Sequence, residues 1–139
     1  MVSVLDTVGT TAIGDRFLAA LSDQDWEALQ NCFAGDTTFR ALVPPGLREG
    51  ADAAAAAGYF RRWFGDADEL DLLASDVEQV EDRISIRYRF RAHEDRWYVV
   101  EQHAYCDVRE GRIERMDLVC SGFRPESEPG EGKTGGQAQ

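Results

Sequence analysis

Residues Trp97–Phe123, WYVVEQHAYCDVREGRIERMDLVCSGF, predict two long strands joined by a tight turn at Glu110-Gly111. The side chains of both segments alternate in polarity, and a two-residue loop fixes the register between them. The pairs counted outward from the turn are Arg109 with Arg112, Val108 with Ile113, Tyr105 with Met116, His103 with Leu118, and Glu101 with Cys120. Because opposed residues share one face of a sheet, this count gathers on one face Val99, Glu101, His103, Tyr105, Met116, Leu118 and Cys120. That face places two ionisable groups and a thiol among apolar side chains, and it is the candidate site.

The preceding segment, Arg83–Ala92 (RISIRYRFRA), predicts which face of this sheet is buried. Arginines alternate along it with isoleucine, tyrosine and phenylalanine, so the apolar side is expected to face the core. If the next loop spans His93–Arg96, Tyr88 pairs with Glu101, and His103 is the next inward position. Both register counts therefore direct Glu101 and His103 toward the apolar interior, although one β-bulge would reverse this result.

The bulk properties of the chain restrict its class. A chain of 139 residues is long enough for one domain with a buried core. Its net charge of −11 argues against nucleic acid and anionic membranes as partners, because both need a basic surface. No stretch reaches the roughly 20 apolar residues of a transmembrane helix, and the N-terminus lacks the basic and apolar regions of a signal peptide. Three cysteines make an odd number without metal-type spacing, which predicts reduced thiols in a cytoplasmic protein.

Hydrophobic periodicity and breaker residues divide the rest of the chain into helices and strands. The expected helices span Ile13–Leu21, Trp26–Phe33 and Ala51–Phe64, and the further strands span Thr37–Val43, Leu47–Gly50, Glu69–Val80 and Arg83–Ala92. Residues before Thr11 are expected to be a loose lead-in, and residues 125–139, rich in Pro, Gly and Glu, a disordered tail. This order predicts one α+β domain over residues 1–124: a cone-shaped, curved antiparallel sheet with three N-terminal helices packed on its concave face. The aromatic side chains of the helices are expected to line or plug a conical cavity against the sheet.

Three features carry a resemblance to a known superfamily. They are the segment DRFLAALSDQDWEALQNCFAGD (residues 15–36), the glycine-flanked third helix, and the sequence V-R-E-G-R-I (residues 108–113) before the last strand. From about Thr11 to Phe123 the chain resembles the nuclear-transport-factor-2-like (NTF2-like) superfamily, and within it the SnoaL-like proteins and ketosteroid isomerases. The resemblance implies a small-molecule pocket and a homodimer formed through the outer face of the sheet. It leaves the activity open, since this scaffold hosts isomerases, cyclases, dehydratases, epoxide hydrolases and non-catalytic binding modules.

The residues that act in two of these families are mostly replaced in this sequence. SnoaL-type polyketide cyclases place a histidine and an aspartate on the last strand, where this chain has Met116 and Leu118. Ketosteroid isomerases use a tyrosine and a general-base aspartate, and the matching positions here are Phe17 and, roughly, Ala41. The position of their second oxyanion-hole acid keeps a proton-bearing group, His103. Neither chemistry is therefore transferred by resemblance.

His103 is the leading catalytic candidate, because an imidazole in an apolar pocket can act as general acid or base near neutral pH. Glu101, two residues away and about 7 Å along the strand, would orient the imidazole, and Tyr88 would donate a hydrogen bond to a substrate carbonyl. The structural alternative is that His103 and Glu101 satisfy each other and only close the cone. The expected substrate-binding residues are Phe17, Trp26, Tyr59, Trp63, Tyr105, Met116, Leu118 and Cys120.

Neither a metal ion nor a cofactor is expected. Two histidines without metal-ligand spacing, and the lack of a glycine-rich phosphate loop, argue against a zinc site and a nucleotide site. The first functional hypothesis is a cofactor-free acid/base enzyme, an isomerase, cyclase or dehydratase (lyase), acting on a small apolar molecule that is ring-containing or polyketide-like. The alternative is a non-catalytic ligand-binding or dimerisation module, and a protein-binding adaptor is a third class. The sequence identifies neither the substrate nor the reaction.

Overall fold

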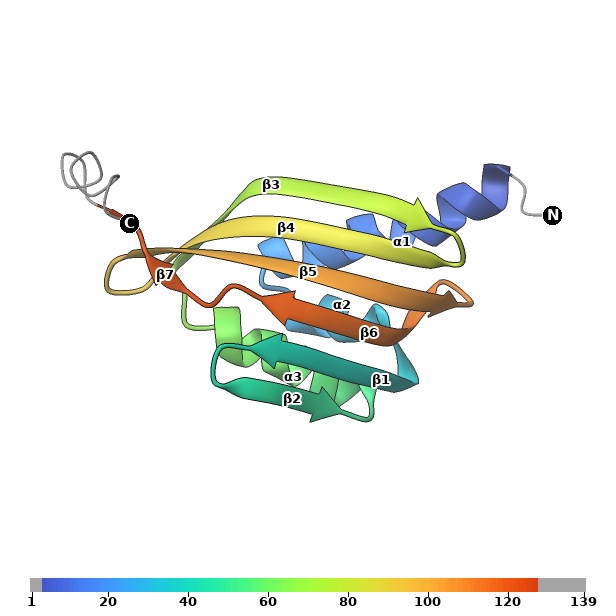
Figure 1. Ribbon diagram of the computed structural model, residues 1–139, viewed down its shortest axis with the longest axis horizontal. Helices are drawn as coiled ribbons and strands as arrows, with labels where there is room; N and C mark the ends of the chain where they lie inside the picture. The colour runs from blue at the N-terminus through green and yellow to red at the C-terminus, as the bar shows by residue number, and fades with distance from the viewer. Residues whose placement is uncertain (1–3, 128–139) are drawn as a thin grey trace.

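A curved sheet with helices on one side forms the framework of the molecule (Figure 1). The computed structural model describes residues 4–127, with side chains from Thr11 onward. The helices are α1 (Val4–Ser22), α2 (Trp26–Asn31) and α3 (Ala53–Phe64). The strands are β1 (Phe33–Val43), β2 (Gly46–Gly50), β3 (Glu69–Val80), β4 (Arg83–His93), β5 (Trp97–Arg109), β6 (Arg112–Cys120) and β7 (Arg124–Pro125). The predicted α+β class, with N-terminal helices packed on a curved sheet, is confirmed.

The strands lie in the order β2-β1-β6-β5-β4-β3, and the short β7 pairs with β5. Helix α3 lies behind β1 and β2, and α1 lies behind β3 and β4 (Figure 1). Strands β1 and β6 run parallel, so the sheet is mixed, whereas the sequence predicted antiparallel pairing throughout. These two strands are far apart along the chain, so no hairpin turn fixes their relative direction.

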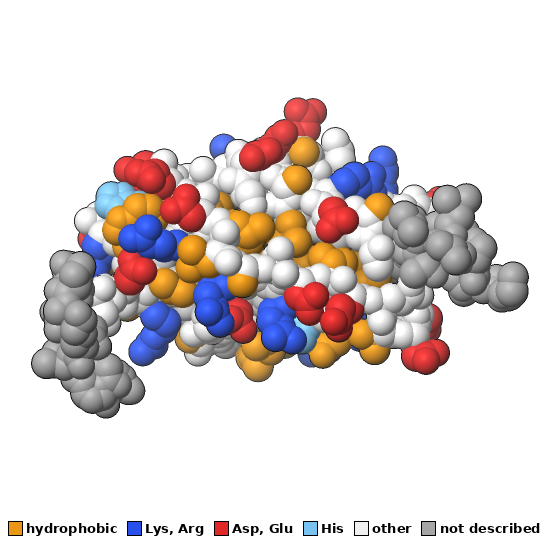
Figure 2. All heavy atoms as spheres, turned by 90° about the horizontal axis from the view of Figure 1, so that it is seen from above, with side chains coloured by type: hydrophobic (Ala, Val, Ile, Leu, Met, Phe, Trp, Pro, Cys, Tyr) orange, Lys and Arg blue, Asp and Glu red, His pale blue; other side chains and the backbone are white. Residues whose placement is uncertain are grey.

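The β3 edge of the sheet exposes charged and apolar side chains together. Figure 2 views the molecule from this side and shows acidic, basic and hydrophobic side chains interleaved on one face. The exposed large hydrophobic residues of β3 are Leu72, Leu73 and Val80. Charged side chains on an edge strand oppose its pairing with another chain. The acidic side chains of β3 are expected to have this effect.

Two elements begin earlier than the sequence predicted. Helix α1 begins at Val4, so residues 4–10 are helical rather than part of a loose lead-in before Thr11. Strand β1 begins at Phe33 rather than at Thr37. Its first residues pair with the start of β6, an interaction that local sequence does not encode.

The beginning of the expected tail belongs to the sheet. Pro125 pairs with Tyr98 in the β5–β7 ladder, and the amide of Glu126 donates to the Trp97 carbonyl at 2.9 Å. Strand β7 thus lies across the predicted boundary at residue 124. The rest of the expected tail, residues 128–139, lies outside the described residues.

Aspartates cap the starts of two helices, and the final hairpin turns where the sequence predicted. The carboxylate of Asp25 accepts a hydrogen bond from the Ala28 amide at 3.1 Å, and that of Asp52 accepts one from the Ala55 amide at 2.8 Å. Each bond satisfies one of the free amides at a helix start. The turn at Glu110-Gly111 is confirmed, with φ of 53° and 77°, which suits a tight hairpin turn.

The register of β5 differs by one residue from the count made on the sequence. Val108 pairs with Ile113 as expected, but Asp107 then pairs with Arg115, so a β-bulge with Glu114 of β6 unpaired shifts every pair beyond it. The pairs then are Cys106 with Met116, Ala104 with Leu118, and Gln102 with Cys120. The loop between β4 and β5 also has three residues rather than four, because His93 pairs with Trp97.

These two shifts reverse the faces of β5. Gln102 faces the interior and is 1% exposed. Glu101, His103 and Tyr105 lie on the outer face of the sheet, where Tyr105 is 41% exposed. The prediction that these three side chains point into the cone is therefore wrong, because a bulge moves a whole side-chain set to the other face.

Aromatic rings fill the concave side of the sheet. The rings that are at most 1% exposed belong to Phe17, Phe33, Phe39, Phe60, Phe64, Tyr88 and Phe90. Phe17 of α1 lies 5.3 Å from the Phe60 ring of α3 and 5.8 Å from the Tyr88 ring of β4, measured between ring centroids. The helix aromatics therefore plug the cone, since rings at these separations leave no room for a ligand between them.

Candidate functional site

A cavity opens at the mouth of the cone, where β6 ends near the turn between β1 and β2 (Figure 1). This mouth cavity has a volume of about 380 Å³. Its lining residues are Val43, Pro44, Pro45, Arg48, Trp63, Cys120, Gly122, Phe123 and Arg124. They come from β1, β2, β6, β7 and helix α3, so segments far apart in the sequence assemble the cavity.

A close approach at Gly122 shapes one wall of the mouth cavity. The φ of Gly122 is 86°, a left-handed value that favours glycine, and a Cβ there would lie 2.7 Å from Cγ of Pro44. After this turn the chain places Phe123 against α3, with its ring centroid 5.3 Å from that of Phe64. Trp63 precedes Phe64 in the same helix and also lines the cavity, so two aromatic side chains, Trp63 and Phe123, contribute to its walls.

A chain of three polar side chains leads from the mouth cavity into the core. The Cys120 Sγ accepts hydrogen bonds from Nε2 of Gln102 at 3.3 Å and from the Gly122 amide at 3.4 Å. The Tyr88 hydroxyl donates to Oε1 of Gln102 at 2.6 Å. Burial raises the pKa of Tyr88 well above its usual value, with Cys120 and Cys106 adding to the rise, so this hydroxyl stays protonated. We call these three side chains, Tyr88, Gln102 and Cys120, the polar chain.

Two arginines lie at the mouth cavity. Arg48 in β2 pairs with the fully buried Ala41, which places its side chain on the concave side of the sheet. Its Nη1 donates to the Leu47 carbonyl at 3.3 Å. Arg124 in β7 pairs with Val99, whose other partner is Arg91 of the outer face, so the strand register places Arg124 at the rim of the cavity and not on the concave side. The lining of the cavity thus combines apolar walls with one inward cation, Arg48, and a second arginine at the rim.

The predicted catalytic pair lies on the opposite face of the sheet. The Nε2 of His103 is 2.8 Å from Oγ of Ser85, and its ring centroid lies 4.7 Å from that of Tyr105. The Glu101 carboxylate accepts hydrogen bonds from Nε and Nη2 of Arg89 at 2.9 and 2.8 Å. Both side chains are thus engaged by outer-face partners, away from the apolar interior.

The predicted substrate-binding residues fall into four groups. Trp63 and Cys120 line the mouth cavity. Phe17, Met116 and Leu118 are buried in the core, Trp26 and Tyr59 pack at its margin, and Tyr105 lies on the outer face. The structure therefore brings two of the eight predicted residues to the cavity.

Sequence reasoning missed Gln102, Arg48 and Phe123. A signal for Gln102 was present, because Ala104 and Cys106 share its parity along β5 and both are small and apolar. The register counted from the Glu110-Gly111 turn was given more weight than this pattern of small apolar residues. Arg48 and Phe123 come from segments with no local feature that marks a site.

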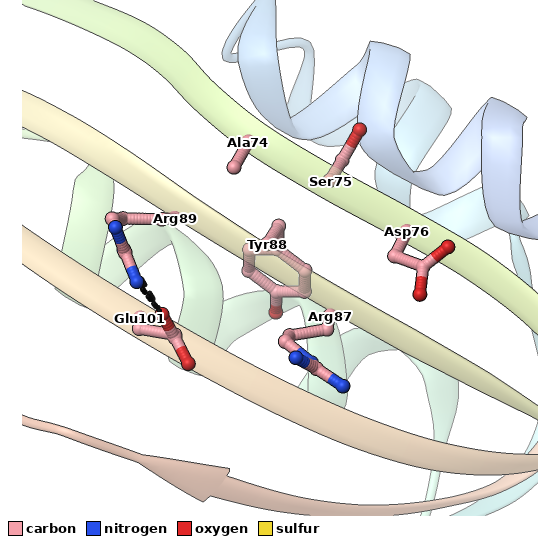
Figure 3. Close-up of a pocket in the computed structure, with 7 residues that line it drawn as sticks. All are labelled: Ala74, Ser75, Asp76, Arg87, Tyr88, Arg89 and Glu101. Carbon is pink, nitrogen blue, oxygen red and sulfur yellow. Dashed lines mark hydrogen bonds and ion pairs between the residues drawn. The ribbon is translucent and has the colours of Figure 1, made fainter.

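A second depression lies on the outer face of the sheet (Figure 3). Its volume is about 170 Å³, against about 380 Å³ for the mouth cavity. Figure 3 labels its lining residues Ala74, Ser75, Asp76, Arg87, Tyr88, Arg89 and Glu101. The ion pair between Arg89 and Glu101 compensates part of its charge, and the Tyr88 hydroxyl is committed to Gln102 on the inner side. The mouth cavity is therefore the better site for a small organic molecule.

The part of the chain that the structure describes contains neither a metal-ligating cluster nor a membrane-spanning helix. Within residues 4–127, no cluster of three or more His, Cys, Asp or Glu side chains could hold a metal ion. No helix in this part of the chain is long and apolar enough to cross a membrane.

The arrangement of helices and sheet defines an α+β protein with the NTF2-like fold. The sequence model of the SnoaL-like domain matches residues 15–116, and the chain belongs to this family. No curated protein matches the chain.

Solved structures with the same fold are distant in sequence. A candidate polyketide cyclase from Xanthomonas campestris pv. campestris is 21% identical, with a TM-score of 0.66 over 81% of this chain and 90% of that chain. An LEH-like epoxide hydrolase from M. tuberculosis is 14% identical, with a TM-score of 0.65 over 84% of this chain and 85% of that chain. An NTF2-like protein from Burkholderia xenovorans LB400 is 15% identical, with a TM-score of 0.64 over 87% and 93% of the two chains. At these identities the likeness shows the fold alone.

Proposed function

We propose that this SnoaL-like protein binds a small apolar organic molecule in the mouth cavity. The proposal is carried by a cavity of about 380 Å³ with aromatic and aliphatic walls and one polar chain in its floor. Ligand sites in proteins have this size and this balance of apolar walls and few polar groups. Trp63, Phe123 and Val43 supply the apolar contact, and each Å² of apolar area removed from water stabilises the complex by about 25 cal/mol. The Cys120 thiol supplies a polar contact.

The geometry favours ligand binding over proton transfer. His103 and Glu101, the expected acid/base pair, are engaged by Ser85 and Arg89 on the outer face. The Tyr88 hydroxyl, which burial keeps protonated, donates within the polar chain rather than into the cavity. The non-catalytic ligand-binding alternative is therefore preferred.

An enzyme of isomerase, cyclase or dehydratase type is the second candidate. It is favoured by the names of two structural relatives, a candidate polyketide cyclase and an epoxide hydrolase. The ionisable side chains at the mouth cavity are Cys120 and the two arginines, so such an enzyme would act through these groups. Loss of turnover in Cys120→Ser, with retained ligand binding, would support this candidate.

Tryptophan fluorescence tests the binding proposal, because Trp63 is one of three tryptophans and lines the cavity. The probe is N-phenyl-1-naphthylamine, a neutral amine that joins a naphthalene to a phenyl ring. We expect it to quench the protein fluorescence to saturation at one probe per chain. Trp63→Phe should remove this response, and the matched control Trp97→Phe should keep it. Unsaturable quenching, or equal quenching in both variants, would contradict the proposal.

Chemical protection of a cysteine gives an independent measure. The bound probe should slow the alkylation of Cys120 by iodoacetamide, because this thiol lines the cavity. Burial raises the thiol pKa of Cys32 and of Cys106, so these two side chains should react slowly with or without probe. Mass spectrometry of tryptic peptides separates the three sites. Unchanged labelling of Cys120 at saturating probe would place the ligand elsewhere.

The proposal includes a homodimer formed through the outer face of the sheet. Leu42 and Val119 are paired neighbours in β1 and β6, and they are 54% and 55% exposed. His103 pairs with Val119 across β5 and β6, and Tyr105 extends the same surface. Contiguous exposed apolar side chains of this kind mark interaction surfaces.

A further inference from the structure

We propose that the ligand of the mouth cavity is an amphipathic anion, a molecule with an apolar body and a carboxylate or similar acidic group held by Arg48, with Arg124 adding positive charge at the rim. This inference rests on the proposed function and adds the chemical class of the ligand. It follows from the charges, the geometry and the surroundings of the two guanidinium groups.

The charge of the cavity contrasts with that of the chain. The chain has a net charge of −11, with 26 acidic and 15 basic residues, yet the cavity lining contains two arginines and no acidic side chain. A cavity lined by charged groups of one sign concentrates ligands of the opposite charge, because apolar walls of low polarisability focus the local electric field. The mouth cavity therefore attracts anions even though the molecule as a whole repels them.

The two arginines differ from most arginines of the sheet in having no acidic partner. Ion pairs engage Arg40, Arg83, Arg89, Arg91, Arg109 and Arg115. Within residues 4–127, neither Arg48 nor Arg124 has a carboxylate within ion-pair distance. Some other described arginines also lack such a partner, but those do not line the apolar cavity. The acidic group of a ligand would neutralise the unpaired guanidinium charge at the mouth cavity.

The position of Arg48 is set by the strand and not by a flexible loop. Its β-pair partner, Ala41, is fully buried, whereas the neighbouring pair of Leu42 with Leu47 points outward. The backbone thus directs Arg48 to the concave side. One of its guanidinium N–H groups donates to the Leu47 carbonyl, and the other donors stay available. Such a fork matches the two oxygens of a carboxylate.

The surroundings of the guanidinium groups define the rest of the ligand. Trp63 and Phe123 provide flat apolar surfaces, and the cavity volume of about 380 Å³ fits a molecule of roughly two or three rings. A charge-assisted hydrogen bond next to such surfaces is stronger than one in open water. An apolar molecule without an acidic group would fill the walls but leave both cations unsatisfied.

A matched pair of fluorescent probes tests this inference. The anionic probe is 1-anilinonaphthalene-8-sulfonate, and the neutral probe is N-phenyl-1-naphthylamine, which has the same ring system without the sulfonate. We expect the anionic probe to bind about tenfold more tightly, which corresponds to about 1.4 kcal/mol. Arg48→Gln and Arg124→Gln should each weaken the anionic probe several-fold and leave the neutral probe unchanged. Added salt should weaken only the anionic probe.

The control and the outcomes separate the two proposals. Arg112→Gln, at the start of β6 and outside the mouth cavity, should leave both affinities unchanged. If neither probe binds in a Trp63-dependent manner, the proposed function itself fails. If both probes bind equally, or if Arg48→Gln and Arg124→Gln act no differently from Arg112→Gln, binding stands and the anion inference is overturned.

Discussion

Gly122 holds the chain in a conformation that other residues rarely adopt. Its φ is 86°, and an added Cβ would lie 2.7 Å from Cγ of Pro44. We expect Gly122→Ala to lower the free energy of unfolding by about 2 kcal/mol, because a left-handed residue and a steric contact each add strain. Urea unfolding measures this change. Pro44 and Gly122 both line the mouth cavity, so the same substitution should weaken probe binding.

Gly58 provides the matched control for this substitution. A Cβ at Gly58 would meet no atom within 4 Å, and the residue lies inside α3. Gly58→Ala should therefore raise the free energy of unfolding by up to about 1 kcal/mol, as alanine favours helix. Equal effects of the two substitutions would show that the close approach at Pro44 carries no strain.

Tyr88 and Gln102 form a buried hydrogen bond that stabilises the fold. Tyr88→Phe removes the hydroxyl and leaves Oε1 of Gln102 without its donor, in a side chain that is 1% exposed. We expect the free energy of unfolding to fall by about 1–3 kcal/mol, the cost of a buried unsatisfied acceptor. The Tyr98 hydroxyl bonds to Asp95 at 3.2 Å at the surface, so Tyr98→Phe should change stability by less than about 0.5 kcal/mol. A neutral Tyr88→Phe would mean that water reaches the polar chain.

The candidate site was predicted from the sequence only in part, and the reason lies in single residues. The structure places Trp63 and Cys120 at the mouth cavity, and their role in binding stays a prediction. His103 and Glu101 were predicted on the wrong face. One extra residue of β6 at the bulge shifts the pairing of β5 with β6 by one, and a loop of three residues rather than four shifts its pairing with β4 by one; neither feature has a side-chain signature.

Between neighbouring strands, the bulge in the β5–β6 ladder lies beside a network of ion pairs on the outer face. Arg83 of β4 contacts Asp107 at 2.7 Å and Asp117 at 3.0 Å, and Arg115 also contacts Asp117, at 3.1 Å. Partial burial raises the pKa of Asp117, but hydrogen bonds from Arg115 and Arg83 outweigh it and lower the pKa below its usual value. Arg83 thus joins β4, β5 and β6 at the point where the ladder is irregular.

The lowered pKa of Asp117 gives a pH-dependent prediction. A carboxyl with a lowered folded-state pKa stabilises the fold above its unfolded-state pKa of about 4, and this contribution is lost as pH falls through the folded-state value. Asp117→Asn should therefore lower the free energy of unfolding by up to about 1 kcal/mol at pH 7 and by less at pH 2–3. Unfolding curves at several pH values measure the difference from the parent protein. Asp76→Asn, which changes a carboxylate without an ion pair among residues 4–127, is the control, and a pH-independent effect of Asp117→Asn would contradict the prediction.

Helices and hairpins were predicted well because their signals are local. Asp25 and Asp52 start their helices, and Glu110-Gly111 turns the final hairpin, each through contacts a few residues apart. The parallel pairing of β1 with β6 was missed, since these strands meet only after the chain has folded. Local sequence thus predicts the elements, and contacts between distant segments decide their order and register.

For the molecule as a unit, the filling of the cone decides where a ligand can bind. Phe17, Phe39 and Phe60 occupy the interior, so free volume remains at the mouth, where β7 and the β1–β2 turn meet. The lining residues come from segments as distant as Val43 and Arg124. No local pattern could predict this cavity, because it exists only where those segments come together.

The proposed homodimer gives the last prediction, since it depends on the complete outer face. Val119 lies at the middle of the apolar group with Leu42 and is 55% exposed, while Val80 at the end of β3 is 47% exposed. Val119→Glu should convert a dimer to a monomer, because two copies related by a twofold axis would bury like charges at their centre. Val80→Glu makes the same chemical change at similar exposure outside this surface and should leave the dimer intact. Sedimentation velocity measures both. A monomeric parent protein, or dissociation by both substitutions alike, would contradict a dimer through this face.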